Sequence, residues 1–325
     1  MTKVLKLLVA LALFAIVPGC SKKEEVKTEE TQVIEVEKEK EEAKKDELSI
    51  NASTFTSKVV IDNMKDSEDT SYNISKNQNY QQIENGDFDI AIVPGYLGPY
   101  FYDKTNQGIE IAAITQLDNI HIVSDFLVNN QKDLMGKNFL IPDPVANLAE
   151  ILDKKIGPAS LFLRLNLEYY KSMDEILDKM DKTSNFMTIL SDPYLTKIED
   201  KDYFQSDLAN LLPIAKGEFV SEIIIVNKDY LKNNKIEFDK FLEDYKESTQ
   251  KLDDEDFDIV VSEDILKSYD ITKEQAKTSL QRSNPVFINE DTMKGTYKVF
   301  LDKLNDLDES LVGENIPDDD LYYEK

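Results

Sequence analysis

One short apolar run, Asp89 to Val93, constrains the fold more than any other stretch of this chain. A polar Asn-Gly-Asp precedes it and Pro94-Gly95 follows it, a pattern that predicts a strand buried on both faces. Such strands are typical of parallel sheets. The aromatic segment Tyr96 to Tyr102 contains its own glycine and proline, which predicts that the chain turns there in a loop. A strand end of this kind is where open α/β sheets place ligands.

The sequence on either side alternates between strand and helix patterns. Strands are predicted at Leu48–Asn51 and Tyr72–Ile74, with a helix at Lys58–Met64 between them, and a second helix around Tyr80–Asn85 leads into the central strand. This order, β-α-β-α-β, predicts a parallel sheet. The same alternation returns in a second block, which predicts two α/β lobes. Its predicted elements are strands at 120–128, 138–141, 164–167 and 185–190 and a helix at 173–180, begun by Ser172.

The charge balance excludes one class of partner. The chain has 38 Lys and Arg against 64 Asp and Glu, a formal net charge of −26. Affinity for nucleic acid comes largely from Lys and Arg that neutralise phosphates, so no nucleic-acid partner is expected. A solvated, soluble surface is the preferred explanation for the excess of carboxylates, and an acidic patch that binds a specific basic partner is the alternative.

One cysteine and one histidine limit the chemistry. A zinc site of Cys and His needs about four such ligands, and nucleophile–His catalysis would depend on His121 alone. His121 lies in an apolar segment and is interpreted as a structural or interdomain histidine. No P-loop and no G-x-G-x-x-G motif occurs, so no cofactor and no metal is predicted. Chemistry by carboxylates alone stays open, because Asp and Glu are abundant.

The first 47 residues have a composition of their own. Lys3 and Lys6 precede an apolar run of secretory length, Leu7 to Val17, so residues 1–19 are predicted to be a signal peptide. Cys20 follows at the expected cleavage point and resembles the cysteine of a bacterial lipobox, although Pro18 is unusual there. A chance cysteine after an ordinary signal peptide is the alternative. Residues 20–47 are then a lipidated cysteine and a disordered, charged tether.

Several motifs, in their order and spacing, resemble one family. They are GDFDIAIVP with its aromatic continuation, DLMGKNFLIP, SDPYLTK, EIIIVNKDYLKNN, SNPVFINED and VGENIPDDDLYYEK. Together they resemble solute-binding lipoproteins of ABC importers, in the branch of nitrate-, sulfonate-, taurine- and thiamine-precursor-binding proteins. The resemblance spans nearly all of the chain from Leu48.

The resemblance implies an α/β, two-lobed type II periplasmic-binding-protein fold, with two doubly wound sheets joined by two crossover strands. Residues 48–115 plus 222–325 would form lobe I and residues 116–221 lobe II, with crossovers near 115–124 and 217–226. Such a protein captures a small molecule between its lobes and delivers it to the permease of an ABC importer. It makes and breaks no bond, so no enzyme activity is expected, and a monomer is expected.

The family's ligand contacts come from loops that follow strands. Carried over to this sequence, the predicted ligand-binding residues are Ser53, Thr54, Phe55, Pro94, Gly95, Tyr96, Asp143, Asn147, Ser191 and Asp192. Among the aromatic residues after Gly95, Tyr96 is the one favoured to face the cleft. Hydroxyl, amide and backbone donors beside aromatic faces orient and desolvate a small ligand.

Two departures bear on the ligand. The segment Ala52 to Thr56 lacks the glycine that related proteins often carry there, and glycine eases the approach of backbone to an anion. No Arg or Lys lies at a predicted loop tip, and the only arginines, Arg164 and Arg282, lie outside the family's cleft motifs. A neutral or cationic heteroaromatic ligand is therefore preferred to a bare anion.

Two alternatives to transport remain. A surface lipoprotein can use the same fold for sensing or adhesion, and nothing in the sequence separates that role from transport. An enzyme similar to a thiamine-precursor synthase would need a histidine and a cysteine of its own chain, and here Cys20 is assigned to the lipid. The predicted location is the outer face of the cell membrane, through the lipid anchor.

Overall fold

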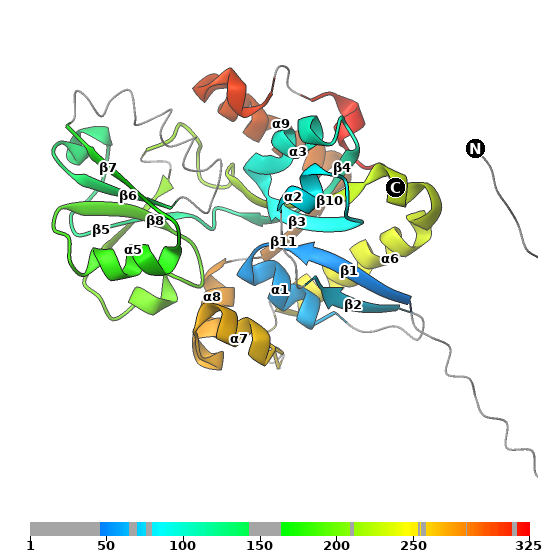
Figure 1. Ribbon diagram of the computed structural model, residues 1–325, viewed down its shortest axis with the longest axis horizontal. Coiled ribbons are helices and arrows are strands. Elements are labelled where there is room, and N and C mark those ends of the chain that lie inside the picture. Colours follow the sequence, from blue (N-terminus) through cyan, green and yellow to red (C-terminus); the bar gives the residue numbers. More distant parts are fainter. Residues whose placement is uncertain are drawn as a thin grey trace, which may run out of the picture. The chain divides into compact units, whose positions relative to one another are not determined.

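Parallel strands at the start of the chain form half of the first sheet. The computed structural model describes residues 46–64, 70–75, 80–142, 164–208, 211–252, 254, 258–283, 285–313 and 317–325. Six strands pair in the order β11-β4-β10-β3-β1-β2 (Figure 1). They are β1 (Asp46–Ala52), β2 (Thr70–Ile74), β3 (Ile90–Pro94), β4 (Ile109–Leu117), β10 (Val220–Asn227) and β11 (Pro285–Asn289).

The predicted parallel order is confirmed for the first three strands, since β1 pairs in parallel with both β2 and β3. The later strands make the sheet mixed, because β10 runs antiparallel between β3 and β4. β1 begins at Asp46, two residues before the predicted start. The buried strand that the apolar run predicted is confirmed as β3, with every residue buried and Pro94 as its last residue.

Helices cover both faces of this sheet because its side chains alternate between two apolar clusters. Ile90 and Ile92 of β3 face a cluster with α1, α6, α7 and α8, whereas Ala91 and Val93 face one with α3 and α9. The helices are α1 (Phe55–Asp62), α2 (Tyr80–Glu84), α3 (Gly98–Lys104), α6 (Lys228–Leu252), α7 (Glu263–Tyr269), α8 (Lys273–Ser283) and α9 (Glu290–Leu307).

The second sheet has five strands in the order β7-β6-β8-β5-β9. They are β5 (His121–Ser124), β6 (Asn138–Pro142), β7 (Asn166–Tyr170), β8 (Phe186–Leu190) and β9 (Phe204–Asp207). Helix α5 (Met173–Met180) lies beside β6 and β8 (Figure 1), and its predicted bounds and its cap at Ser172 are confirmed. Short 3₁₀ helices complete the described elements: η1 (Gly95–Leu97), η2 (Gln131–Leu134), η3 (Thr196–Ile198), η5 (Glu309–Leu311) and η6 (Asp319–Leu321).

Several sequence predictions are wrong in detail. The helix predicted at Lys58–Met64 begins at Phe55 and ends at Asp62, because Thr54 caps it. The aromatic segment after Gly95 is helical, as η1 and α3, because Pro99 occupies the first turn of α3, where proline suits a helix. The strand predicted at 120–128 ends at Ser124, because the Asp125 carboxylate accepts hydrogen bonds from the backbone N–H groups of Asn185 and Phe186. The strand predicted at 164–167 begins later, at Asn166.

The two mixed sheets form two lobes, and two segments of chain connect them. One joins β4 to β5 through Asp118, and the other leads from β9 to β10 through Phe219. The Asp118 carboxylate accepts hydrogen bonds from the backbone N–H groups of Gly217 and Phe219, so the two connections are tied together. The predicted lobe boundaries stay a proposal. No helix among the described residues is long and apolar enough to span a bilayer.

Candidate functional site

The loop after β1 brings Ser53 and Thr54 to the carboxyl ends of the parallel strands. The backbone N–H and the hydroxyl of Ser53 both donate to the Ile92 carbonyl oxygen, at 3.0 and 2.9 Å. Thr54 caps α1, and its hydroxyl oxygen accepts from the backbone N–H of Ser57 at 3.2 Å. Both predicted residues are half-buried, so their side chains are partly exposed at this edge of the sheet.

A buried carboxylate lies beside this loop. Glu222 stands near the start of β10, opposite Pro94 of β3, and its side chain is fully buried. The Thr54 hydroxyl donates to Oε1, and the Thr115 hydroxyl donates to Oε2 at 2.9 Å. Burial raises the pKa of Glu222 to about 7, opposed by these hydrogen bonds, by Ser57 and by the charge of Lys58. Glu222 thus titrates near neutral pH.

Lys58 supplies a positive charge close to this carboxylate. Its Nζ donates to the Tyr269 hydroxyl at 3.2 Å and lies 5.0 Å from the centre of the Tyr269 ring. Burial lowers the pKa of Lys58, and the negative charge of Glu222 opposes that shift. Lys58 lies one turn into α1 rather than at a loop tip, so the pattern of loop residues in the sequence does not indicate it.

Three of the predicted site residues are packed in the protein interior. The Phe55 ring is buried and meets the Tyr269 ring edge-on at 5.5 Å. Pro94 is the buried last residue of β3. Gly95 lies against β10, where an added Cβ would stand 2.7 Å from Val220 Cγ1 and collide with the Val220 carbonyl. In this structure Gly95 allows close approach of two backbones.

Tyr96 points into the core, and its hydroxyl has no hydrogen-bond partner among the described residues. Its ring lies 6.5 Å from that of Phe219. Burial, and then the nearby Tyr80, raises the pKa of Tyr96 well above its usual value. Burial also raises the pKa of Tyr80, opposed by a hydrogen bond with Ser53, and the charge of Glu222 adds to the increase.

The unpartnered hydroxyl gives a first prediction. Tyr96→Phe should raise the free energy of unfolding by about 1 kcal/mol, because it removes a buried polar atom that lacks a partner. Tyr297→Phe is the matched control, since the buried Tyr297 hydroxyl donates to the Gly95 carbonyl at 2.7 Å. That variant should lose roughly 1–3 kcal/mol. Urea unfolding measures both, and equal losses in the two variants would contradict this account of Tyr96.

Ser191 and Asp192 follow β8 in the second sheet, at the end where the sequence placed them. Ser191 is half-buried and Asp192 is buried. The Asp192 carboxylate accepts hydrogen bonds from Arg282 Nε at 2.8 Å and from Nη2 at 2.5 Å. Arg282 is thus a partner of Asp192 that the sequence motifs did not reveal, because the two residues lie 90 positions apart.

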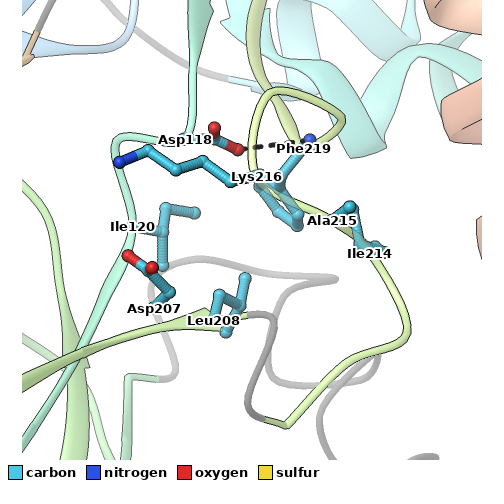
Figure 2. A pocket seen from close by; sticks show the side chains of 8 residues that line it. All are labelled: Asp118, Ile120, Asp207, Leu208, Ile214, Ala215, Lys216 and Phe219. Carbon is cyan, nitrogen blue, oxygen red and sulfur yellow. Dashed lines mark hydrogen bonds between the residues drawn. The ribbon is translucent and has the colours of Figure 1, made fainter.

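His121 and a small cavity lie near the two connecting segments. Burial lowers the pKa of His121, and the negative charges of Asp192 and Asp207 oppose the shift. Figure 2 shows the cavity, lined in part by Asp118, Asp207 and Phe219, with the hydrogen bond from Phe219 N to Asp118. Its volume of about 20 Å³ suits one water molecule. An organic solute needs more space than this.

The remaining predicted residues, Asp143, Asn147 and the lipidated Cys20, lie outside the described residues. Among the described residues the structure brings together Ser53, Thr54 and Glu222, with Lys58 and Tyr80 beside them. Glu222 was missed because its two partners, Thr54 and Thr115, lie 168 and 107 positions away. The sequence does contain one local indication of a buried carboxylate. Glu222 directly precedes the strongly apolar run Ile-Ile-Ile-Val, and charged residues are rarely buried unless they have partners.

Neither family models nor curated proteins match this chain. Solved structures do resemble it. The periplasmic aliphatic sulphonate binding protein SsuA from Escherichia coli aligns with a TM-score of 0.61 at 11% identity, covering 86% of this chain and 92% of that one. The ligand-binding component of an ABC-type import system from Staphylococcus aureus, with zinc bound, aligns with a TM-score of 0.58 at 14% identity, covering 85% and 96%.

An enzyme shares the same architecture. The desulfurization enzyme DSZB aligns with a TM-score of 0.54 at 11% identity, covering 83% of this chain and 95% of that one. At such identities the likeness concerns the fold and not the activity. The predicted fold class is confirmed: the chain has the two-lobed α/β fold of the periplasmic solute-binding proteins of ABC transporters.

Proposed function

We propose that this protein is an extracytoplasmic solute-binding lipoprotein that captures a small molecule between its lobes and delivers it to an ABC importer. The observation that carries the proposal is the fold together with the polar groups at its strand ends. The Thr54 hydroxyl donates to the buried Glu222, whose charge also raises the pKa of Tyr80, and Ser53 precedes Thr54 at the edge where α/β sheets bind ligands. The partners of such a protein are the solute and the permease, and the protein acts as a monomer.

The proposed ligand is neutral or cationic and heteroaromatic. A carboxylate accepts hydrogen bonds from ring or exocyclic N–H groups, and tyrosine rings offer apolar faces for stacking. Glu222 provides the carboxylate. Its charge adds to the rise that burial causes in the pKa values of Tyr80, Tyr269 and Tyr245, of which Tyr80 and Tyr269 are half-buried and Tyr245 is buried. Lys58 balances part of that charge, so a neutral ring with N–H donors suits the group of residues as well as a cation does.

Attachment to the membrane completes the proposal. Lipidation of Cys20 would hold the protein on the outer face of the cell membrane, and the charged segment that follows would act as its tether. A sensing or adhesion role on the same fold would use the same anchor. Binding of a permease by the ligand-loaded form separates transport from that role.

Enzyme activity is the second candidate function, and the raised pKa of Glu222 is the observation that favours it. A carboxyl with a pKa of about 7 suits general acid–base catalysis at neutral pH, and Glu222 has that pKa. The desulfurization enzyme with the same fold shows that this architecture accommodates catalysis. Turnover of the bound compound distinguishes the two functions.

A thermal-shift screen of the purified protein tests the proposal. The panel contains pyrimidines, thiamine, riboflavin, amino acids, polyamines, taurine, alkyl sulfonates and nitrate. A ligand that binds only the folded state should stabilise it by about 2.7 kcal/mol at a hundredfold excess over its Kd. We expect the shift from a heteroaromatic compound. A shift from nitrate or a sulfonate alone would contradict the proposed ligand class, and no shift from any organic solute would count against solute binding.

A further inference from the structure

Arg282, near the end of α8, reaches across to the segment that follows β8. Its Nε and Nη2 donate to the two oxygens of Asp192 at 2.8 and 2.5 Å. Nη2 also donates to the Thr196 hydroxyl at 2.6 Å, and Nη1 donates to Glu199 Oε1 at 2.8 Å. Such a bidentate contact between guanidinium and carboxylate is among the strongest and most directional hydrogen-bonded contacts in proteins.

The pair is protected from water. The Asp192 side chain is 0% exposed and that of Arg282 is 24% exposed. Two further contacts surround it: the hydroxyls of Thr196 and Ser279 lie 2.7 Å apart, and the rings of Tyr194 and Tyr269 meet edge-on at 6.1 Å. Helices α7 and α8 therefore hold residues 191–199 through ionic, hydroxyl and aromatic contacts at once.

The partners in these contacts belong to different lobes. Helices α7 and α8 pack on the six-stranded sheet, where Ile265 and Leu280 join its apolar cluster. Residues 191–199 pack on the five-stranded sheet, where Leu195 and Ile198 join another cluster. The chain connects the two sheets through two segments only, near Asp118 and Phe219, within the part of the chain that the structure describes. The placement of one lobe on the other thus depends strongly on non-covalent contacts.

We propose that Arg282 and Asp192 form an ionic latch that holds α8 against the segment after β8 and thereby keeps the lobes together. This assigns Asp192 to closing the protein, in place of the ligand contact that the sequence predicted. Loss of the arginine leaves a buried carboxylate without its cation, whereas water hydrates that carboxylate once the lobes part. The latch acts in the protein without ligand and does not depend on the proposed solute.

Distance measurements between the lobes test the latch. The exposed Lys182 and Lys298 are replaced by cysteine in the full chain carrying Cys20→Ser, and fluorescence energy transfer reports their separation without ligand. Arg282→Gln should raise the ratio of separated to closed molecules at least about tenfold. Lys267→Gln is the control, because Lys267 and Glu263 form an exposed ion pair within α7. That control should match the parent protein.

A double variant separates the latch from general damage to the fold. Asp192→Asn removes the charge that Arg282→Gln leaves unpaired, so Asp192→Asn with Arg282→Gln should be less separated than Arg282→Gln alone. Unchanged energy transfer in Arg282→Gln would overturn the proposal. So would a change in the double variant that equals the sum of the changes in the two single variants. If Arg282→Gln does not fold, Asp192→Asn alone must show the increased separation. Because every reading is made without ligand, failure of the latch and failure of solute binding are distinguishable.

Discussion

Glu222→Gln should stabilise the protein by about 3 kcal/mol at pH 8 and leave its stability nearly unchanged at pH 4.5. The pKa of Glu222 is raised to about 7 in the folded protein, against 4.5 for an ordinary glutamate, chiefly because the side chain is fully buried. The protonated carboxyl therefore favours folding. Its contribution is complete below pH 4.5, falls as the pH rises and is lost above pH 7. Glutamine keeps the shape of the side chain and does not ionise.

Urea unfolding of both proteins at pH 4.5, 6, 7 and 8 measures this difference. Other titrating groups are common to the two proteins, so their effects cancel when one free energy of unfolding is subtracted from the other. Glu274→Gln, which changes an exposed carboxylate on α8, is the control and should follow the wild type at every pH. A difference between Glu222→Gln and wild type that does not grow with pH would show that Glu222 ionises normally.

Gly95→Ala should lower the free energy of unfolding by about 1–3 kcal/mol. The added Cβ would collide with the carbonyl of Val220, and backbone of β10 cannot move aside as a flexible side chain can. The carbonyl of Gly95 accepts a hydrogen bond from the Tyr297 hydroxyl, so a shift of Gly95 would weaken that bond too.

Gly295→Ala is the matched control for that variant. Gly295 is exposed within α9, and an added Cβ meets nothing within 4 Å. Alanine there should stabilise the protein by about 0.5–1 kcal/mol, because it reduces the freedom of the unfolded chain. Opposite signs for the two substitutions are the expected result. If both variants destabilise equally, the close approach of η1 to β10 is not what requires Gly95.

Local signals allowed much of the fold to be predicted. The helix Met173–Met180 was predicted with its bounds, because Ser172 as cap and the apolar spacing are both read within one stretch. The strand ended by Pro94 was predicted for the same reason. The helical aromatic segment was missed because glycine and proline suit a helix start as well as a loop.

The centre of the candidate site was not predictable in this way. Glu222 joins Thr54 and Thr115, and Arg282 joins Asp192, across large separations in sequence that no local pattern records. The sequence motifs identified one residue of each contact, Thr54 and Asp192. Their partners, Glu222 and Arg282, become neighbours only when the chain folds.

The central claim is that a solute binds beside Glu222 and leaves unchanged. Calorimetric titration of the compound found in the screen into wild type, Glu222→Gln and Glu110→Gln tests it most directly, with mass spectrometry of the recovered compound. Glu110 is a half-buried carboxyl near the start of β4. It pairs with Val226, at the other end of β10 from Glu222, and so is a matched control. The account predicts binding at least about tenfold weaker in Glu222→Gln, equal to wild type in Glu110→Gln, and recovery of the compound intact. Equal affinity in all three proteins, or a converted compound, would contradict it.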